Sequence, residues 1–548
     1  MKYISTRGLA PEVTSTEALL NGIAPDGGLY VPVEIPARDA LPDWLEPDCD
    51  YAGTMRKLLA LFFDDIPENV RNAAVERSVA RFANPKEPVS LRWAGKEERI
   101  VEAGENDFDE SDEEEKTELV DSNLYFLDLT QGPTGAFKDV ALTILPTLLQ
   151  YAAEQAGLKK AAILTATSGD TGSAAMRGFA DVAGTEVLVF FPKTGTSEIQ
   201  RRQMVCCEGG NVHACAIEGN FDDAQAGVKA VFADEKIRAD AAAKGIFLSS
   251  ANSINIGRLF PQVCYYIMAW RALYAAKKLG EDGFDVVVPT GNFGNILAAF
   301  YAKKLGTPIR RFIVASNENN VVAEFIQRGI YNVKCHVLKK HSPRTFKVTN
   351  SPSMDILVSS NIERFIFEIS GRNSEFVRES MANLKEKGEF VLDAVADAGL
   401  KDAGFDSGFA GQGKTLYGIQ EAWKRFKNLL DPHTAIGLKV AATNAEDAST
   451  CVPVVIAETA TPWKFPKTVI EGLRQKGSFN PRGLKNPSET SDFENLKNLA
   501  DYVARELSQE ERENFSPRFG ELETAPVLHD LVCAKDRIGE TVRQVFGI

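Results

Sequence analysis

Residues 161–173 read Ala-Ala-Ile-Leu-Thr-Ala-Thr-Ser-Gly-Asp-Thr-Gly-Ser, and this stretch indicates the class of fold. Ala161–Thr167 is short and apolar, as buried strands are, and we expect a helix from Gly172 to Ala180. A further strand is expected at Glu186–Pro192. Short apolar strands that alternate with alanine-rich helices are typical of a parallel sheet. The sequence therefore predicts an α/β protein.

A second strand-to-helix junction lies later in the chain. Phe284–Thr290 is predicted as a strand, Gly291-Asn-Phe-Gly-Asn295 as a loop and Ile296–Leu305 as a helix. Glycines let the backbone approach a ligand closely, and the free amides at a helix start favour a phosphate. The loop fits neither the P-loop nor the dinucleotide pattern, so a small phosphorylated cofactor is expected rather than ATP or NAD. The alternative is a purely structural turn.

The first junction also carries hydroxyl groups. Thr167-Ser-Gly-Asp-Thr-Gly-Ser173 packs hydroxyl and amide donors between a strand and a helix, which suits the oxygens of a carboxylate or phosphate. We therefore expect Ser168, Gly169, Asp170 and Thr171 to bind an anionic group of the substrate. The alternative is helix capping by Ser168, Asp170 or Thr171.

One lysine stands in a small apolar turn, Gly132-Pro-Thr-Gly-Ala-Phe-Lys-Asp139. Partial desolvation would lower the pKa of Lys138 and free a neutral amine to attack a carbonyl group. Taken alone, Lys138 would be interpreted as a solvated surface residue. The two junctions favour the reactive interpretation.

Composition narrows the possible functions. The chain has 548 residues, which predicts two or three domains, and its net charge of −14 argues against a nucleic-acid or anionic-membrane surface. No apolar stretch is long enough for a membrane span and no signal peptide is evident, so a cytoplasmic location is expected. The eight cysteines lack CxxC spacing and the five histidines show no metal-ligand spacing, so we expect reduced thiols and no metal site.

The chain divides into four predicted parts. They are an N-terminal unit over 1–95, with helical periodicity through Met55–Arg81, and a linker over 96–122 with an acidic insertion at 102–118. A catalytic region of two α/β subdomains follows over 123–470, and then a helical C-terminal segment over 471–548. The acidic insertion is interpreted as a solvated surface loop.

A reactive lysine, a phosphate-binding loop and a hydroxyl loop in one α/β chain together predict a pyridoxal 5'-phosphate (PLP) enzyme. The motifs quoted above, together with several further segments, closely resemble those of the threonine synthases. Those segments are Tyr3–Gly8, Ala24–Pro32, Asn252–Arg258, Ser353–Asn361 and Asp431–Gly437. The resemblance implies the fold of tryptophan synthase β, fold type II, with two open α/β domains and an additional N-terminal domain.

The resemblance also implies roles for particular residues. Lys138 would form the Schiff base with PLP, Gly291, Asn292, Phe293, Gly294 and Asn295 would hold its phosphate, and Thr459 would hydrogen-bond its pyridine nitrogen. Three positions depart from the family pattern. Gln131 and Thr461 replace histidines, and Gly135 replaces a bulky residue.

The implied reaction converts O-phospho-L-homoserine and water to L-threonine and phosphate. Such a substrate needs two anion sites. The hydroxyl loop is assigned to its carboxylate, and Ser253, Asn255 and Arg258 are assigned to its phosphate, since a guanidinium group binds phosphate oxygens well. The alternative for this second group is a capped helix with a structural salt bridge. His433 is interpreted as a turn or packing residue and has no assigned role.

Two other functions stay open. One is a PLP phospho-lyase that acts on phosphohomoserine or phosphoserine and releases a keto acid. The other is a non-catalytic regulatory protein that keeps the PLP fold, suggested by the departures at Gln131, Gly135 and Thr461. The expected partner is a small-molecule substrate, and a monomer or a homodimer is expected.

Overall fold

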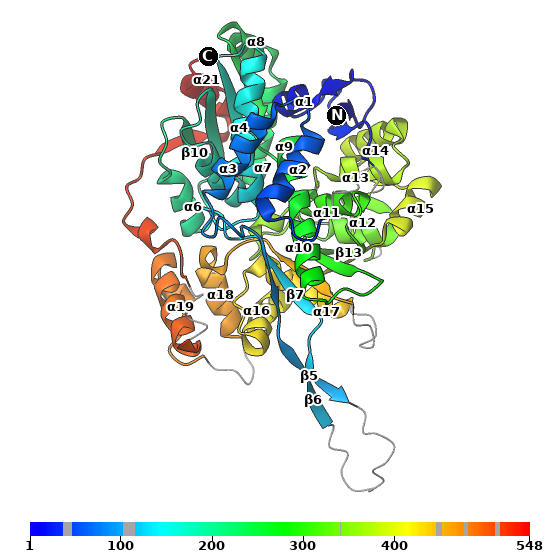
Figure 1. The fold of residues 1–548 in the computed structure, drawn as a ribbon. Coiled ribbons are helices and arrows are strands. Elements are labelled where there is room, and N and C mark those ends of the chain that lie inside the picture. Colours follow the sequence, from blue (N-terminus) through cyan, green and yellow to red (C-terminus); the bar gives the residue numbers. More distant parts are fainter. Residues whose placement is uncertain (37–45, 102–115, 340, 445–451, 476–480, 510–515) are drawn as a thin grey trace.

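The computed structural model describes residues 1–36, 46–101, 116–339, 341–444, 452–475, 481–509 and 516–548. Its first large sheet, which contains β10 (Figure 1), has the order β11-β8-β9-β10-β18, and all neighbouring strands are parallel. Its strands are β8 (Lys160–Ala166), β9 (Thr185–Pro192), β10 (Val212–Glu218), β11 (Ile246–Ser250) and β18 (Leu531–Ala534).

Helices cover both faces of this first sheet. Ile163 packs in one cluster with α4 and α5, whereas its neighbour Leu164 packs in another with α7, α8 and α21. Burial on both faces explains why the strand sequences are apolar throughout rather than alternating. The helices around this sheet are α4 (Lys138–Gln155), α5 (Asp170–Phe179), α6 (Glu198–Val205), α7 (Phe221–Ala233), α8 (Glu235–Ala243) and α21 (Ile538–Phe546).

The second large sheet has the order β16-β13-β12-β17-β7-β4 and is parallel except for the edge pair β4–β7. Its strands are β4 (Ser90–Trp93), β7 (Leu124–Asp128), β12 (Phe284–Pro289), β13 (Ile309–Ser316), β16 (Phe405–Phe409) and β17 (Val454–Glu458). The helices near it are α9 (Ile256–Leu259), α10 (Val263–Ala275), α11 (Gly294–Lys304), α12 (Val321–Arg328), α13 (Ile362–Ile369), α16 (Gln412–Phe426), α17 (Pro432–Thr443), α18 (Pro466–Leu473) and α19 (Asp492–Glu506).

Smaller elements complete this half of the molecule. Helices α14 (Ser374–Lys387) and α15 (Ala394–Ala403) precede and follow β15 (Glu389–Val391), which pairs antiparallel with β14 (Ile330–Asn332). The predicted α/β fold with parallel-rich sheets is confirmed. Both predicted junctions are present: β8 leads into α5, and β12 leads into α11.

The N-terminal part contributes an antiparallel sheet of β1 (Lys2–Ser5), β2 (Val13–Thr14) and β3 (Tyr30–Pro32), with α1 (Ser15–Asn21). The helical periodicity predicted over Met55–Arg81 is interrupted. It forms two helices, α2 (Tyr51–Phe62) and α3 (Glu68–Val79), because Pro67 has no N–H and lies at the start of the second helix. Helix α3 packs against α4, which carries Lys138.

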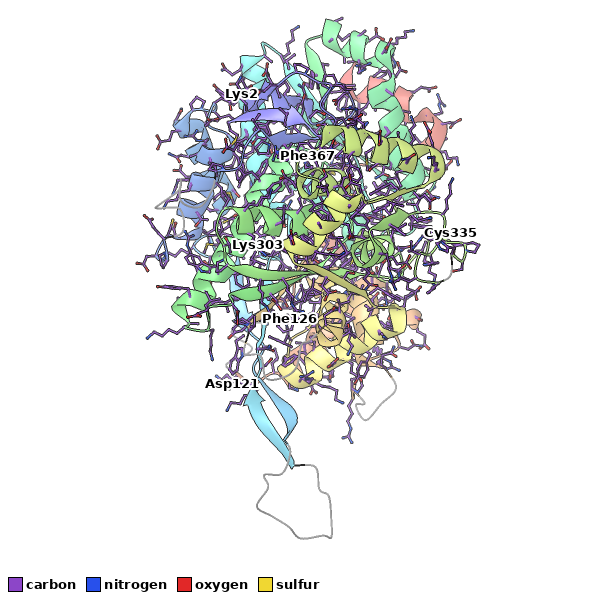
Figure 2. The ribbon with its side chains drawn as sticks, turned by 90° about the vertical axis from the view of Figure 1, so that its right-hand side faces the viewer. Lys2, Asp121, Phe126, Lys303, Cys335 and Phe367 are labelled. Atoms are coloured by element: carbon purple, nitrogen blue, oxygen red, sulfur yellow. The ribbon has the colours of Figure 1, made fainter. Side chains whose placement is uncertain are left out.

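The linker forms an antiparallel hairpin of β5 (Lys96–Val101) and β6 (Lys116–Asp121). Figure 2 shows that this hairpin projects from the body of the molecule beyond Asp121. Residues 102–115 of the predicted acidic insertion lie outside the described residues.

The C-terminal segment differs from the helical prediction at one element. Besides α19 and α21 it contains β18, which pairs in parallel with β10 at the edge of the first sheet. Four residues, Leu-Val-Cys-Ala, are too few to show a strand pattern in the sequence. The domain boundaries at 95, 122 and 470 stay a proposal. Among the described residues, no helix is long and apolar enough to cross a membrane.

Candidate active site

A cavity of about 840 Å³ lies where the carboxyl ends of β8 and β12 face each other. This is where parallel α/β folds place their ligands. Most of the residues selected from the sequence line it: Lys138, Ser168, Asp170, Thr171, Ser253, Arg258, Gly291, Asn292, Phe293, Gly294, Asn295 and Thr459. Gly169 and Asn255 do not.

The Gly291–Asn295 loop leaves donors available at the start of α11. Phe293, the N-cap residue, has a left-handed backbone with φ of 63°, and no side chain caps the helix. The first amide groups of α11 therefore lack the partners that a capping residue supplies. Backbone strain at a non-glycine residue commonly marks a functional site. This loop has the properties of a phosphate-binding helix start.

The side-chain amide of Asn295 adds a further donor beside the helix start. Tyr266 donates to Oδ1 of Asn295, whereas the buried Nδ2 of Asn295 has no hydrogen-bond partner in the described structure. An unpaired buried amide is costly unless a ligand satisfies it. A phosphate group on the loop would do so, and the residues present therefore fit the phosphate of PLP.

The Gly291–Asn295 loop is hydrogen-bonded to Ser359–Asn361, a segment for which the sequence alone indicates no role. Ser359 Oγ donates to the Gly291 carbonyl at 2.7 Å, and Ser360 Oγ donates to Asn292 Oδ1 at 3.1 Å. The backbone N–H of Asn361 donates to the Asn292 carbonyl at 3.1 Å. A side chain at Gly291 would lie 2.9 Å from the Ser353 carbonyl oxygen, so glycine is needed there. Ser359–Asn361 thus fix the position of the loop.

The hydroxyl loop is capped by a residue outside the predicted set. Thr167 Oγ1 accepts hydrogen bonds from the N–H groups of Gly169 at 2.9 Å and Gly172 at 3.1 Å. Because Thr167 caps α5, the hydroxyls of Ser168 and Thr171 are not used for this purpose. Both residues line the cavity, and neither hydroxyl bonds to a residue that the structure describes.

Asp139 and a neighbouring strand end shape the lysine turn. The Asp139 carboxylate accepts from the Thr134 hydroxyl at 2.7 Å and from the Thr134 N–H at 2.9 Å. The Phe137 N–H donates to the Thr459 carbonyl at 3.0 Å, and Tyr265 donates to the Phe137 carbonyl at 2.6 Å. The turn therefore holds Lys138 at the first position of α4, beside Thr459. No described residue hydrogen-bonds the Thr459 hydroxyl.

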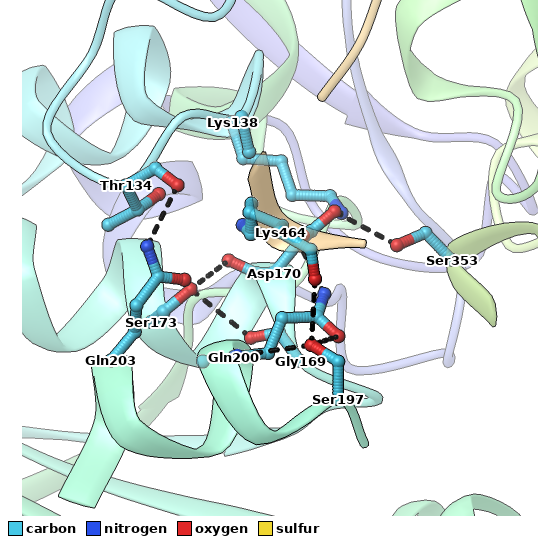
Figure 3. Close-up of polar contacts among 12 residues, drawn as sticks. Thr134, Lys138, Gly169, Asp170, Ser173, Ser197, Gln200, Gln203, Ser353 and Lys464 are labelled. Atoms are coloured by element: carbon cyan, nitrogen blue, oxygen red, sulfur yellow. Dashed lines mark hydrogen bonds and ion pairs between the residues drawn. The ribbon is translucent and has the colours of Figure 1, made fainter. Parts of the chain in front are cut away.

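The amine of Lys138 meets a carboxylate rather than open solvent. Lys138 Nζ lies 3.1 Å from Asp170 Oδ2, and Lys464 Nζ lies 2.5 Å from Asp170 Oδ1 (Figure 3). Gln200 donates to Oδ1 at 2.8 Å and Ser353 donates to Oδ2 at 2.9 Å. Asp170 is thus surrounded by four donors. The carboxylate of Asp170 is therefore unsuited to face a substrate anion, because a buried carboxylate repels another carboxylate, and the role predicted for residue 170 stays a prediction.

Burial and charge together set the proton affinities of this pair. Burial lowers the pKa of Lys138; Asp170 opposes this effect, and Lys464 and Arg258 reinforce it. Burial raises the pKa of Asp170, but Lys138 and Lys464 together hold it well below its ordinary value. The lowered pKa of Lys138 favours its neutral, nucleophilic form.

The three residues predicted for the substrate phosphate have different surroundings. Asn255 caps α9, accepts from the Gly257 N–H and donates to the Leu19 carbonyl, so its side chain is used in the fold. The structural alternative therefore holds for Asn255, and its assignment to the phosphate is corrected. Arg258 lines the cavity and has a buried Nε without a partner among the described residues. Burial lowers its pKa to about 10, which still leaves it cationic at neutral pH.

His433 lies at the cavity wall in a defined hydrogen-bonding state. Its Nε2 accepts from the Ser353 backbone N–H at 3.3 Å, and its Nδ1 is 2.6 Å from Asp431 Oδ1. Since a backbone N–H can only donate, Nε2 carries no proton and Nδ1–H donates to Asp431. This arrangement orients the loop that carries Ser353.

Two of the three departures from the family pattern contact each other. The Thr461 N–H donates to the Gly135 carbonyl at 2.9 Å, and a Cβ added at Gly135 would lie 2.5 Å from Thr461 Cγ2. Phe519 closes the same space, 3.2 Å from that Cβ position. The third departure, Gln131, donates to Asp128 at 2.5 Å. Gly135 and Thr461 are thus a matched pair, and neither of them lines the cavity.

We expect Gly135→Ala to destabilise the protein by about 2–4 kcal/mol, because it adds a steric overlap with Thr461 to a left-handed backbone. The matched control is Gly157→Ala. Gly157 has φ of 68°, close to the 69° of Gly135, but nothing lies within 4 Å of its Cβ position. Urea denaturation measures the loss of stability in both variants. The loss in Gly157→Ala reports backbone strain alone, and the additional loss in Gly135→Ala reports the overlap with Thr461. Equal losses would show that the contact with Thr461 costs nothing.

Comparison with known proteins agrees with this geometry. Residues 112–401 match the model of the pyridoxal-phosphate dependent enzymes, residues 2–79 match the threonine synthase N terminus, and residues 434–514 match the threonine synthase C-terminal model. The threonine synthase of Methylobacillus glycogenes is 35% identical, over 87% of this chain and 93% of its own length. That of Pseudomonas aeruginosa is 37% identical, over 86% and 90%. Human threonine synthase-like 1 is 33% identical, over 86% of this chain and 61% of its own.

Solved structures show the same likeness. The PLP-bound threonine synthase from Brucella melitensis superposes with a TM-score of 0.78 at 32% identity, and the match covers 100% of both chains. The yeast threonine synthase gives 0.77 at 26% identity, over 100% of this chain and 99% of its own. Fold and site together define a PLP-dependent α/β enzyme of fold type II. Within that class, the chain belongs to the threonine synthase family and is a PLP-dependent lyase.

Proposed function

We propose that the enzyme converts O-phospho-L-homoserine and water to L-threonine and phosphate. The observation that carries this proposal is the convergence of a buried amine and several anion-binding donors on one cavity. Lys138, an uncapped helix start, the hydroxyls of Ser168 and Thr171, and Arg258 all line it. The substrate has a carboxylate at one end and a phosphate at the other, and PLP brings a phosphate of its own, so three anion sites are required.

PLP would be held by residues from three elements. The first amides of α11 and Asn295 Nδ2 would bind its phosphate, the Thr459 hydroxyl would face its ring nitrogen, and Lys138 would bind its aldehyde. When bound, PLP stabilises negative charge on the carbons near the substrate amino group.

The remaining steps belong to the side chains of the chain. Lys138 Nζ would carry protons to and from Cα and Cβ of the substrate, since a neutral amine accepts a proton and the resulting ammonium returns it. Ser168 and Thr171 would orient the substrate carboxylate. Gly169 would shape this loop through its backbone, since its Cβ position is 2.6 Å from Gln200.

Arg258 and Ser253 would bind the leaving phosphate. A guanidinium group keeps its charge when buried and pairs with phosphate oxygens, which stabilises the departing anion. Ser253 lines the cavity, and its Oγ is 3.3 Å from Ser360 Oγ, next to the Gly291–Asn295 loop. Asp170 and Asn255 are left out of this assignment.

A product assay tests the reaction. The purified enzyme is incubated with PLP and O-phospho-L-homoserine, and threonine, 2-oxobutyrate and phosphate are measured together. We expect threonine and phosphate in equal amounts. 2-Oxobutyrate as the sole product would replace the proposal with a phospho-lyase, and absence of phosphate release would favour a non-catalytic protein. The cytoplasmic location and the monomer or homodimer expected from the sequence stay predictions.

A further inference from the structure

Lys464 is a fully buried lysine to which the sequence analysis assigned no role. It ends the 3-10 turn Pro462–Lys464 that follows β17, and its side chain is 0% exposed. Its ammonium group lies 2.5 Å from Asp170 Oδ1, and no other described residue accepts a hydrogen bond from it. A buried ammonium of this kind is costly and calls for an explanation.

The cluster contains more cations than anions. Lys138 and Lys464 share the single carboxylate of Asp170, and Arg258 is a further cation that acts on Lys138. Asp139 is the second acid nearby, but burial raises its pKa and its oxygens already accept hydrogen bonds from Thr134. His433 is a further titratable group near Asp170, but its Nε2 accepts a hydrogen bond and carries no proton, so it adds no cation to the cluster.

Lys138 cannot serve as a lasting partner of Asp170. To join PLP, its neutral Nζ adds to the aldehyde carbon, a carbon–nitrogen double bond forms, and one water leaves. The ammonium form must first give a proton to solvent, because it has no lone pair. During turnover the same nitrogen changes its proton and bonding state repeatedly. A second, chemically unchanging cation keeps Asp170 ionised throughout.

We propose that Lys464 is a positioning residue that acts as the permanent counter-ion of Asp170 and thereby leaves Lys138 free to react as a neutral amine. The inference rests on the proposed role of Lys138 but not on which product the enzyme releases. Lys464 does not line the cavity, so it acts through Asp170 rather than on the substrate.

The alternative is that Lys464 merely fills space in the core. Replacing a buried ion pair with apolar groups of similar volume is often neutral for stability, so packing alone gives no reason for a charge here. The two explanations predict different effects of pH. A packing role affects folding, whereas a counter-ion role also changes the pH at which Lys138 becomes reactive.

The test measures how fast PLP joins the full-length apoprotein. PLP is added at a series of pH values, and the growth of the visible absorption band gives the rate. In Lys464→Met, Lys138 is the one ammonium group left beside Asp170, and it no longer has a second cation nearby that repels its proton. Both changes raise the pKa of Lys138. We therefore expect the midpoint of the rate profile to move to higher pH and the rate at neutral pH to fall roughly tenfold.

Two further single variants sharpen the result. Lys464→Arg keeps the charge and is expected to restore the wild-type midpoint, which a requirement for lysine packing would not allow. Lys439→Met is the matched control. Lys439 is 2.7 Å from Glu421, is 18% exposed and does not line the cavity, so its loss should leave the profile unchanged.

An unchanged pH profile in folded Lys464→Met would overturn the proposal. If that variant does not fold, Asp170→Asn/Lys464→Met decides, because it removes one charge of each sign. The double variant is compared with Asp170→Asn, in which Lys464 still repels the Lys138 ammonium, so its midpoint should lie above that of Asp170→Asn. Equal midpoints in these two variants would also refute the role of Lys464. If the visible absorption band of bound PLP is unaltered in Lys138→Ala, the proposed role of Lys138 itself is refuted.

Discussion

Replacing Lys138 with alanine is expected to abolish the visible absorption band of the PLP-loaded enzyme and to lower turnover by about a thousandfold or more. Three lysines line the cavity, and Lys229 and Lys385 are exposed, whereas the side chain of Lys138, at the start of α4, is only 12% exposed. Its loss removes both the covalent attachment of PLP and the group that moves protons on the substrate. Absorption spectra and steady-state rates measure the two effects separately.

The phosphate loop should still bind PLP in this variant, because Asn295 and the start of α11 are unchanged. We therefore expect PLP to remain with Lys138→Ala after gel filtration, although more weakly than with the wild type. Lys304→Ala is a suitable control, since Lys304 pairs with Glu368 outside the cavity. A visible band that persists in Lys138→Ala would contradict the assignment.

Short local patterns predicted the strand, the loop and the helix around Gly291–Asn295 well. The strand, the glycine loop and the helix start of 284–305 are contiguous, and β12 and α11 lie within one residue or two of their expected bounds. Their physical cause is local too: an apolar strand, two glycines and an uncapped helix. Such features depend little on the rest of the chain.

The surroundings of Lys138 could not be predicted in this way. Ser353 reaches Asp170 across 183 residues, and Lys464 arrives from the segment after β17. Asp170 was grouped with hydroxyl donors because it stands between Gly169 and Thr171, yet its partners come from other elements. One signal was present. Lys464 stands between Trp463 and Phe465, and a lysine in an apolar run after a strand is a candidate for burial.

The departures from the family pattern can be explained only from the folded structure. Gly135 and Thr461 are far apart in the sequence, so the sequence alone does not relate one to the other. In the structure they fill one space together with Phe519. Steric complementarity between distant residues explains them, and neither reduces the case for catalysis.

Asp170→Asn is expected to destabilise the apoprotein by about 3–5 kcal/mol, since it leaves two buried ammonium groups without a carboxylate. An amide does not supply the lost charge, and its NH2 group faces other donors. Urea denaturation at neutral pH measures the loss. Asp397→Asn is the control: Asp397 is exposed and pairs with Lys401, so its change should stay within about 0.5 kcal/mol.

The effect of pH has a definite sign. The pKa of Asp170 is lowered in the folded protein, so its stabilisation is complete above the ordinary Asp pKa of about 3.9 and is lost as pH falls toward the folded value. The gap in unfolding free energy between wild type and Asp170→Asn should therefore narrow in strong acid. If the difference in unfolding free energy is the same at pH 7 and in strong acid, Asp170 contributes through its shape rather than its charge. If there is no difference at either pH, the two lysines need no carboxylate. Partial recovery in Asp170→Asn/Lys464→Met would identify the unpaired ammonium groups as the cause, because only one buried cation then remains at this carboxylate position.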